Sequence, residues 1–368
     1  MSRILYITDR RPASGHGAGE RTLSIYNALR KIAEVDLLFI AYPGVAIEAN
    51  PGERVVHLLE GSAKPTQWYW RKRAYLLKDF RRDKRVHAVV AEAMRERNYA
   101  AFFGRYHLPL LTGCEDFGPS FIDVDDLPMD TWSSPLPLFD SIRRLAFFRA
   151  LSRQQTVFVT KQADLQRIRH PDVRLLPCIS TLPDQTGPIQ GAGASGRMLF
   201  VGSTAWAPNR EGIVRFIEKC LPRIRERVPG AVLRVVGKGG TVVAGPAGVS
   251  AADFVPDLFA EYQQASIVIC PIHRGGGSIV KLAEAAAYGR PIVATPYAAR
   301  GYEGILKPGS ELLVAESDEE FAQVCANLLL DDHLRATLSV NARRAAEGHL
   351  DQSAIDRSIG EAMLPRMK

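Results

Sequence analysis

Short apolar runs alternate with polar, glycine-containing loops along the first half of the chain. The run Arg3–Thr8 (RILYIT) predicts a buried strand, and an amphipathic helix is predicted from Arg21 to Ile32. The apolar run Val35–Ala41 (VDLLFIA) then predicts a second strand. Strand, loop, helix and strand in this order are typical of a doubly wound α/β domain with a parallel sheet.

The same order restarts in the second half. Strands are predicted at Met198–Val201 and Val232–Val236, on either side of a long helix from Glu211 to Arg227. Between the halves, residues 177–196 are rich in proline and glycine and carry little charge. This composition is typical of a linker.

The position of the linker indicates where one domain ends and the next begins. An N-terminal domain is expected over residues 1–180 and a C-terminal domain over residues 195–350, and the last helix, in 350–368, is expected to pack back on the first domain. The predicted fold class is therefore α/β, with two Rossmann-like domains that face each other across a cleft. Ligands commonly bind in clefts between domains.

A glycine-rich turn in the second half predicts an anion site. The stretch Pro271–Pro296 (PIHRGGGSIVKLAEAAAYGRPIVATP) follows the strand-like run Ile267–Cys270 and contains the helix-forming run Ile279–Ala287. A glycine turn that leads into a helix presents free backbone N–H groups and the positive end of the helix dipole. Lys281 and Glu284 share one face of that helix at i, i+3. We predict that this stretch binds the phosphates and the sugar of a nucleotide.

Polar side chains end two predicted strands of the first half. His107 follows the strand Ala100–Phe103, while Asp123 and Asp125 lie at the end of the strand Phe121–Val124. Open α/β sheets bind their ligands at the carboxyl ends of strands, so these three residues are candidate catalytic residues. The alternative is structural, because Asp is common in helix caps and turns. The aspartate spacing lacks the glycine and the distal glutamate of a calcium loop, so no metal site is predicted.

Composition and charge narrow the class of protein. Of the 368 residues, 46% are hydrophobic and 24% are charged, which is typical of a folded globular protein. The five cysteines have no paired spacing, which favours a reducing cytosol over a disulfide framework. No signal peptide or membrane-spanning run is recognisable, so we expect a cytoplasmic protein. The net charge of +7 favours anionic partners.

The basic charge is concentrated in one segment. Residues Lys64–Arg85 (KPTQWYWRKRAYLLKDFRRDKR) mix Lys and Arg with Trp, Tyr and Phe. This mixture suits the interface of an anionic membrane, and equally an ordinary helix whose aromatic side chains face the core. It also resembles a surface for single-stranded nucleic acid, but no nucleic-acid motif accompanies it and we predict no such partner. A peripheral position on the inner face of the cell membrane is therefore one expectation.

The second half resembles the donor-binding domain of GT-B glycosyltransferases of the "glycosyl transferases group 1" type. The similar stretches follow one another in the family's order: LFVGSTAWAPNREGI, VVGKGG, GGGSIVKLAEAAAYGRPIVATPYAARGYEGI, GSELLVAESDEEFAQ and LSVNAR. The first half resembles the family's more variable acceptor domain through the GER, FIDVDD and TVFVTKQAD stretches. The resemblance implies transfer of a sugar from a nucleotide-diphosphate donor to an acceptor hydroxyl, without a required metal or cofactor. It also implies a role in surface polysaccharide or glycolipid synthesis, with a sugar or lipid-linked acceptor.

The resemblance also implies roles for individual residues. Glu284 matches the glutamate that binds the donor ribose, and either Lys281 or Arg210 would neutralise the leaving diphosphate. His107 would lie near the donor sugar. The remaining implied donor-binding residues are Gly15 and Gly17 in the N-terminal glycine loop, and Gly276, Gly277, Ser278 and Ile279 around the diphosphate.

Two departures from the family's pattern concern the chemistry. The basic residue expected just after Gly202 is absent, because Ser203 and Thr204 stand there. Retaining members carry two glutamates separated by seven residues; Glu284 matches the second, and the first, which touches the donor sugar, falls on Gly276. A retaining route uses the leaving phosphate as the proton acceptor, whereas an inverting route would need a base such as Asp125, Asp123 or His107. We expect the retaining route from the resemblance.

Two other functions fit the same architecture. A nucleotide-sugar 2-epimerase shares the two-domain organisation and would use a nucleotide sugar without an acceptor. A non-catalytic nucleotide-binding scaffold is compatible with glycine at position 276.

Overall fold

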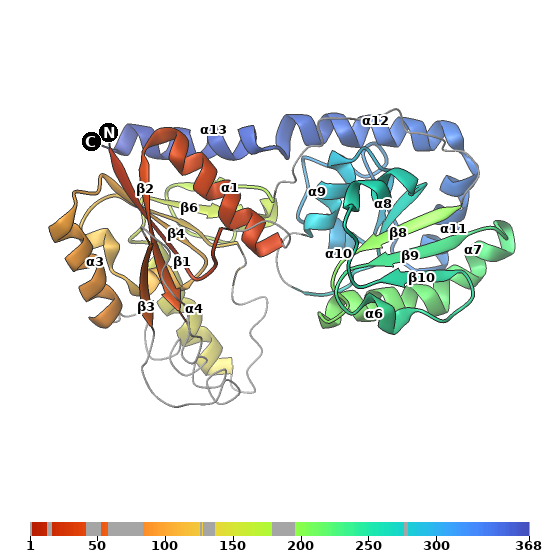
Figure 1. The fold of residues 1–368 in the computed structure, drawn as a ribbon, viewed down its shortest axis with the longest axis horizontal. Coiled ribbons are helices and arrows are strands. Elements are labelled where there is room, and N and C mark those ends of the chain that lie inside the picture. Colours follow the sequence, from red (N-terminus) through yellow and green to blue (C-terminus); the bar gives the residue numbers. More distant parts are fainter. Residues whose placement is uncertain are drawn as a thin grey trace. The chain divides into compact units, whose positions relative to one another are not determined.

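The computed structural model describes residues 2–12, 17–41, 53–57, 84–125, 127, 137–178, 196–275 and 279–367. They form two compact units. Unit 1 comprises Met1–Leu176 together with Gln352–Lys368, and unit 2 comprises Pro177–Asp351. In Figure 1 each unit is a sheet with helices on both sides. Most of the predicted membrane segment, residues 64–83, and most of the predicted linker lie outside the described residues.

Unit 1 contains a parallel sheet of seven strands in the spatial order β3-β2-β1-β4-β5-β6-β7. Its strands are β1 (Arg3–Thr8), β2 (Glu34–Ala41), β3 (Glu53–His57), β4 (Ala101–Arg105), β5 (Ser120–Asp123), β6 (Thr156–Val159) and β7 (Val173–Leu175). Its helices are α1 (Gly17–Ile32), α3 (Lys84–Glu96), α4 (Pro137–Leu151), α5 (Gln162–Leu165) and α13 (Gln352–Met363), with 3-10 turns η1 (Leu108–Leu111), η2 (Cys114–Asp116) and η6 (Leu364–Arg366).

The sequence of unit 1 explains this arrangement. In β1 all residues after Arg3 are buried, as expected for a parallel strand that is covered on both faces. The last helix, α13, packs against α1 and buries Ile355 and Ile359. Ser358 Oγ donates a hydrogen bond of 3.2 Å to the Leu175 carbonyl at the end of β7. Residues far apart in sequence therefore complete one core.

Unit 2 contains a second parallel sheet of six strands in the order β10-β9-β8-β11-β12-β13. Its strands are β8 (Arg197–Val201), β9 (Val232–Val236), β10 (Val249–Ala252), β11 (Ile267–Cys270), β12 (Ile292–Ala294) and β13 (Leu313–Val314). Its helices are α6 (Ala207–Arg215), α7 (Leu221–Arg227), α8 (Leu258–Gln264), α9 (Val280–Ala287), α10 (Pro296–Ala299), α11 (Asp318–Leu330) and α12 (Asp332–His349), with the π-helical turn η4 (Phe216–Cys220) and the 3-10 turn η5 (Gly240–Val243).

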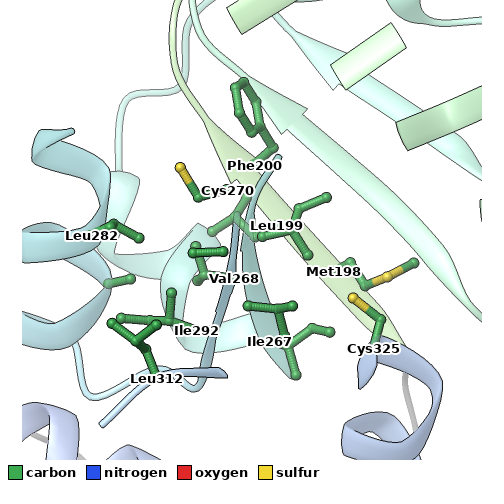
Figure 2. Close-up of a cluster of buried hydrophobic side chains, with 14 of the residues drawn as sticks. Met198, Leu199, Phe200, Ile267, Val268, Cys270, Leu282, Ile292, Leu312 and Cys325 are labelled. Carbon is green, nitrogen blue, oxygen red and sulfur yellow. The ribbon is translucent and has the colours of Figure 1, made fainter. Parts of the chain in front are cut away.

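The core of unit 2 lies between its central strands and the helices packed on them. Figure 2 shows Leu199 and Phe200 of β8 beside Val268 and Cys270 of β11, with Leu282 of α9 against them. Every residue of β11 is buried. Because α9 buries its leucine and all four of its alanines, its two charged residues remain on the less buried face.

The helices of unit 2 begin and end at recognisable signals. The Ser317 hydroxyl accepts a hydrogen bond of 3.1 Å from the Glu320 N–H and caps α11, and Asp331 caps α12 in the same way. Helix α8 begins at Leu258, where the Asp257 side chain caps the Ala260 N–H. The long helix predicted from Glu211 begins at Ala207 and contains the π-helical turn.

Candidate functional site

The strand order of unit 2 defines a point where ligands bind in open α/β sheets. The central strands β8 and β11 are neighbours, and the chain continues from β8 to β9 on one side and from β11 to β12 on the other. The connections after β8 and β11 therefore leave the sheet in opposite directions. Ligands bind outside the carboxyl ends of the strands at such a topological switch point. Gly202 directly follows β8, and α9 follows the connection after β11.

Two glycines bring the ends of β8 and β9 close together. A Cβ atom on Gly237 would lie 2.6 Å from the carbonyl carbon and oxygen of Gly202, and φ of Gly237 is +140°. A Cβ atom on Gly202 would lie 2.9 Å from Asn209 Nδ2 and 3.2 Å from Lys281 Cε. Since any side chain here would displace backbone or a charged group, glycine is required at both positions.

Lys281 lies at this switch point. Its Nζ donates a hydrogen bond of 2.9 Å to Asn209 Oδ1 and lies 5.1 Å from the centre of the Phe200 ring. Burial lowers the pKa of Lys281 from its usual value. The Asn209 side chain is in turn fixed, because its Nδ2 donates a hydrogen bond of 2.9 Å to the Ser203 carbonyl.

Glu284 lies one helical turn after Lys281 and has a different partner. The Tyr262 hydroxyl, on α8, donates a hydrogen bond of 2.9 Å to Glu284 Oε2. Tyr262 is fully buried and stacks on Tyr288, with ring centres 4.3 Å apart. Burial, followed by the charge of Glu284, raises the pKa of Tyr262 well above its usual value, so its hydroxyl keeps the proton that it donates.

The chain on both sides of residues 276–278 is held in place. The Tyr297 hydroxyl donates a hydrogen bond to the Gly275 carbonyl, and the Tyr302 hydroxyl donates one of 3.1 Å to the Ile279 carbonyl. Gly275 has φ of +136°, and a Cβ there would lie 2.7 Å from the Trp206 ring. The predicted residues Gly276, Gly277 and Ser278 themselves lie outside the described residues.

The predicted donor-binding residues are thus distributed unevenly. Lys281, Glu284 and Ile279 lie on α9 or immediately before it. Arg210 lies on α6 with an exposed side chain, and its neighbour Asn209 makes the contact to Lys281. In unit 1, Gly17 is the first residue of α1, and Gly15 lies outside the described residues.

Unit 1 has its own polar cluster at the carboxyl ends of β4 and β5. Arg21 of α1 donates from Nε and Nη2 to the two oxygens of Asp123, at 2.8 Å and 2.6 Å. Arg105 Nη2 donates to Asp125 Oδ2 at 2.9 Å. Burial alone would lower the pKa of Arg105, but the charges of Asp125 and Asp123 raise it above its usual value. The two arginines and two aspartates balance one another in charge.

The predicted catalytic residues differ in accessibility within this cluster. Asp123 is fully buried, while the Asp125 side chain is 19% exposed. His107 is buried and stacks on Tyr106, with ring centres 4.2 Å apart. Thus β4 and β5 bring the predicted trio to one edge of the sheet, and Asp125 is its most accessible carboxylate.

Two residues of this edge have unusual backbone conformations. Tyr106 has φ of +70° and Asp125 has φ of +58°, and they are the described non-glycine residues with positive φ. Left-handed conformations of this kind cost about 1–3 kcal/mol and gather at functional sites. The backbone N–H of Tyr106 donates a hydrogen bond of 2.7 Å to the Asp123 carbonyl, which links the two strand ends.

Sequence reasoning missed the residues that hold the candidates in position. These residues are Arg21, Arg105, Asn209 and Tyr262, and no motif in the sequence marks them. An asparagine next to proline at a helix start gives no sign of its partner 72 residues later.

Over the described ranges, no helix is long and apolar enough to cross a membrane. The same residues contain no group of three His, Cys, Asp or Glu arranged to hold a metal ion.

Residues 195–331 match the model of the family described as Glycosyl transferases group 1. This segment contains the switch point, α6, α8 and α9. No curated protein sequence matches the chain significantly.

Solved structures resemble the chain over nearly its whole length. Sucrose-phosphate synthase from Thermosynechococcus elongatus is 18% identical, with a TM-score of 0.69 and 99% of both chains covered. The Anabaena protein HepE, in complex with UDP and glucose, is 15% identical, with a TM-score of 0.66 over 99% of this chain and 100% of that chain. A trehalose-phosphate synthase from Burkholderia xenovorans is 14% identical, with a TM-score of 0.66 and 100% of both chains covered.

At these identities the likeness to solved structures shows the fold, which is the GT-B fold predicted from the sequence. The predicted resemblance to group 1 glycosyltransferases is confirmed over residues 195–331 by the family match.

Proposed function

We propose that this protein is a glycosyltransferase. It would move a sugar from a nucleoside-diphosphate sugar to an acceptor hydroxyl. The observation that carries the proposal is the pair Lys281 and Glu284, which lie one turn apart on the less buried face of α9 at the switch point of unit 2. A cation and a carboxylate at this spacing suit the two polar parts of such a donor, the diphosphate and the ribose. A neighbour of the same fold, HepE, was solved with UDP and glucose.

In this proposal the two residues have different tasks. The Glu284 carboxylate accepts hydrogen bonds from the ribose hydroxyls, while its other contact, from Tyr262, fixes its orientation. The Lys281 ammonium faces the diphosphate, on which negative charge develops as the bond to the sugar breaks. A preorganised cation at that position stabilises the transition state.

The proposed route is retaining and requires no metal. The acceptor oxygen forms a bond to the anomeric carbon on the face from which the diphosphate departs. The bond between that carbon and the phosphate oxygen breaks, and the acceptor proton moves to the departing phosphate. Because the leaving group takes the proton, this route needs no protein base.

Unit 1 would bind the acceptor. Asp125, His107 and Asp123 lie at the carboxyl edge of its sheet, and Asp125 is the most exposed of these three. Under the inverting alternative Asp125 is therefore the base that we would test first. Asp123 has both oxygens bonded to Arg21 and suits a structural role better.

The proposed setting is the cytoplasm, at the inner face of the cell membrane. The product would be a surface polysaccharide or a glycolipid, with a sugar or a lipid-linked acceptor as second substrate. The basic and aromatic composition of residues 64–85 supports membrane contact, since each basic residue near an anionic surface contributes about 1 kcal/mol.

Calorimetry with UDP, GDP and ADP tests the proposal. We expect one of these nucleotides to bind, and Glu284→Ala to weaken its binding about tenfold or more, since the ribose hydroxyls lose a charged acceptor. The matched control is Glu226→Ala, because Glu226 is an exposed glutamate on α7 of the same unit. Unchanged affinity in Glu284→Ala would contradict the role assigned to Glu284. If the wild-type protein bound none of the three nucleotides, the proposed function itself would be contradicted.

A further inference from the structure

The connection after β8 contains no basic side chain before α6. It reads Gly-Ser-Thr-Ala-Trp from Gly202 to Trp206. The cation beside this strand end comes instead from α9, because Lys281 Cε and Nζ lie 3.2 Å and 3.3 Å from the position of a Gly202 Cβ. A glycine is therefore what allows an ammonium from another helix to reach the end of β8.

The Lys281 ammonium has a neutral hydrogen-bond partner in place of an ion pair. Within the described part of the chain its Nζ forms no ion pair, and its hydrogen-bond partner is the neutral amide of Asn209. Glu284 stands at i+3, a spacing that permits an ion pair, yet its carboxylate bonds to Tyr262. The Lys281 ammonium is thus held by a neutral group. A partly buried cation without an ion-pair partner favours binding of an anion.

The Asn209 side chain holds the Lys281 ammonium without neutralising its charge. Its side chain is only 5% exposed, and both of its polar ends are used. Nδ2 donates to the Ser203 carbonyl, so Oδ1 is the end that faces the ammonium. An ammonium has donors only, and an amide oxygen is the neutral acceptor that matches it.

We propose that Asn209 is a positioning residue, which holds the Lys281 ammonium at the end of β8 and keeps its charge available for the diphosphate of the donor. This inference rests on the proposed function and makes it more specific, because it assigns the charge-neutralising role to Lys281 and its support to Asn209. An aspartate at 209 would satisfy the ammonium and remove the anion site.

A double-mutant cycle separates this role from a merely structural one. Affinity for whichever of UDP, GDP and ADP binds the wild-type protein most tightly is measured in Asn209→Ala, Lys281→Met and the double variant. We expect each single variant to lose about tenfold in affinity, the size of one charge-assisted hydrogen bond. In the Lys281→Met background the Asn209→Ala change should then have less than about a twofold effect, since residues that act through one contact are not additive.

Asn209→Asp provides a second test that keeps the side-chain volume, should Asn209→Ala not fold. We expect it to bind the nucleotide at least about tenfold more weakly while its Tm stays near that of the wild type, because the new ion pair offsets the lost bond to Ser203. The matched control is Asn327→Asp, at an exposed asparagine on α11 that bonds to Arg227.

The outcomes are distinguishable. The proposal is overturned if Asn209→Ala weakens binding equally in both backgrounds, or if Asn209→Asp binds as tightly as the wild type. In both cases the proposed function stands. If the wild-type protein binds none of the three nucleotides, the proposed function fails and this inference fails with it.

Discussion

The two charged residues of α9 each form a hydrogen bond with a neutral group and no ion pair with each other. Lys281 is bonded to an amide and Glu284 to a phenol, although the two residues lie one turn apart. A charge held by a neutral group keeps most of its field, whereas an ion pair cancels it. The same helix can therefore offer a cation and an anion to different parts of one ligand.

The pKa of Lys281 makes nucleotide binding depend on pH. Burial lowers this pKa from its usual value of 10.5, and only the charged form attracts a diphosphate. Affinity should therefore be full below the pKa in the folded protein and should fall as the pH rises through it. We expect calorimetry on the alkaline side of neutrality to show this loss at a lower pH than an exposed lysine would.

The control for this prediction is Lys281→Arg. Arginine stays charged over the whole range, so the variant should keep its affinity where the wild type loses it. The other titratable groups that face Lys281 are Glu284 on α9 and the Cys270 thiol on β11. A parallel decline in both proteins would assign the pH dependence to the nucleotide or to one of these two groups.

At the scale of single elements, one carboxylate on β2 accepts hydrogen bonds from three neighbouring side chains. Asp36 accepts hydrogen bonds from Arg3 Nη1 at 3.1 Å, from Arg97 Nη1 at 2.9 Å and from the Tyr99 hydroxyl at 2.7 Å. Burial alone would raise the pKa of Asp36, but hydrogen bonds from Tyr99 and Arg97 and the charge of Arg3 lower it below its usual value. This carboxylate therefore joins β1, β2 and the end of α3.

We expect Asp36→Asn to destabilise unit 1 by about 1–3 kcal/mol, because the charged acceptor of three donors is lost. The stability that Asp36 provides is present above its unfolded pKa and is lost as the pH falls through the lower folded pKa. Chemical denaturation at neutral and at acid pH measures both effects. Glu34→Gln, at the exposed neighbour that also pairs with Arg3, should change the stability by less than about 0.5 kcal/mol.

The hydrophobic pattern predicted the central elements well, because their signal is local. Strands such as β11 are unbroken apolar runs, and Ser317 marks the start of α11 as its cap. The strands β3 and β10 were not predicted. They read ERVVH and VSAA, lie at the edges of their sheets, and owe their conformation to pairing with β2 and β9. Edge strands need less apolar surface, so their sequences carry a weaker signal.

In the candidate site, too, residues with a local sequence signal could be predicted and residues without one could not. Lys281 and Glu284 could be found from a glycine turn and helical spacing, which are local. The partners that orient them could not, because Asn209 and Tyr262 reach α9 only through the sheet topology. The left-handed backbone of Tyr106 is equally hidden, since an aromatic residue gives no sequence sign of a positive φ.

At the scale of the whole molecule, unit 1 depends on a helix encoded after unit 2. α13 buries Ile355, Ile359 and Met363 in unit 1, and its Lys31–Asp356 ion pair and Gln352–Ser24 hydrogen bond tie it to α1. Sequence position is thus a poor guide to which core a segment belongs to.

We expect Ile359→Ala to destabilise unit 1 by about 2–4 kcal/mol, because it leaves a cavity under α13. Hydrogen exchange followed by mass spectrometry should show faster exchange in α1 and β1 and unchanged exchange in β8 and β11. The control is Glu361→Ala, an exposed residue of the same helix, which should alter neither unit. Faster exchange confined to unit 2 would contradict the assignment of α13 to unit 1.

The discontinuity of unit 1 has a consequence for how the protein is made. A ribosome produces α13 only after it has produced all of unit 2, so unit 2 is the first domain that can close during synthesis. Until then the surface of α1 that α13 covers is exposed and available to chaperones. A premature stop codon anywhere in unit 2 would therefore deprive both units of essential residues, and no truncated product would retain an intact unit 1.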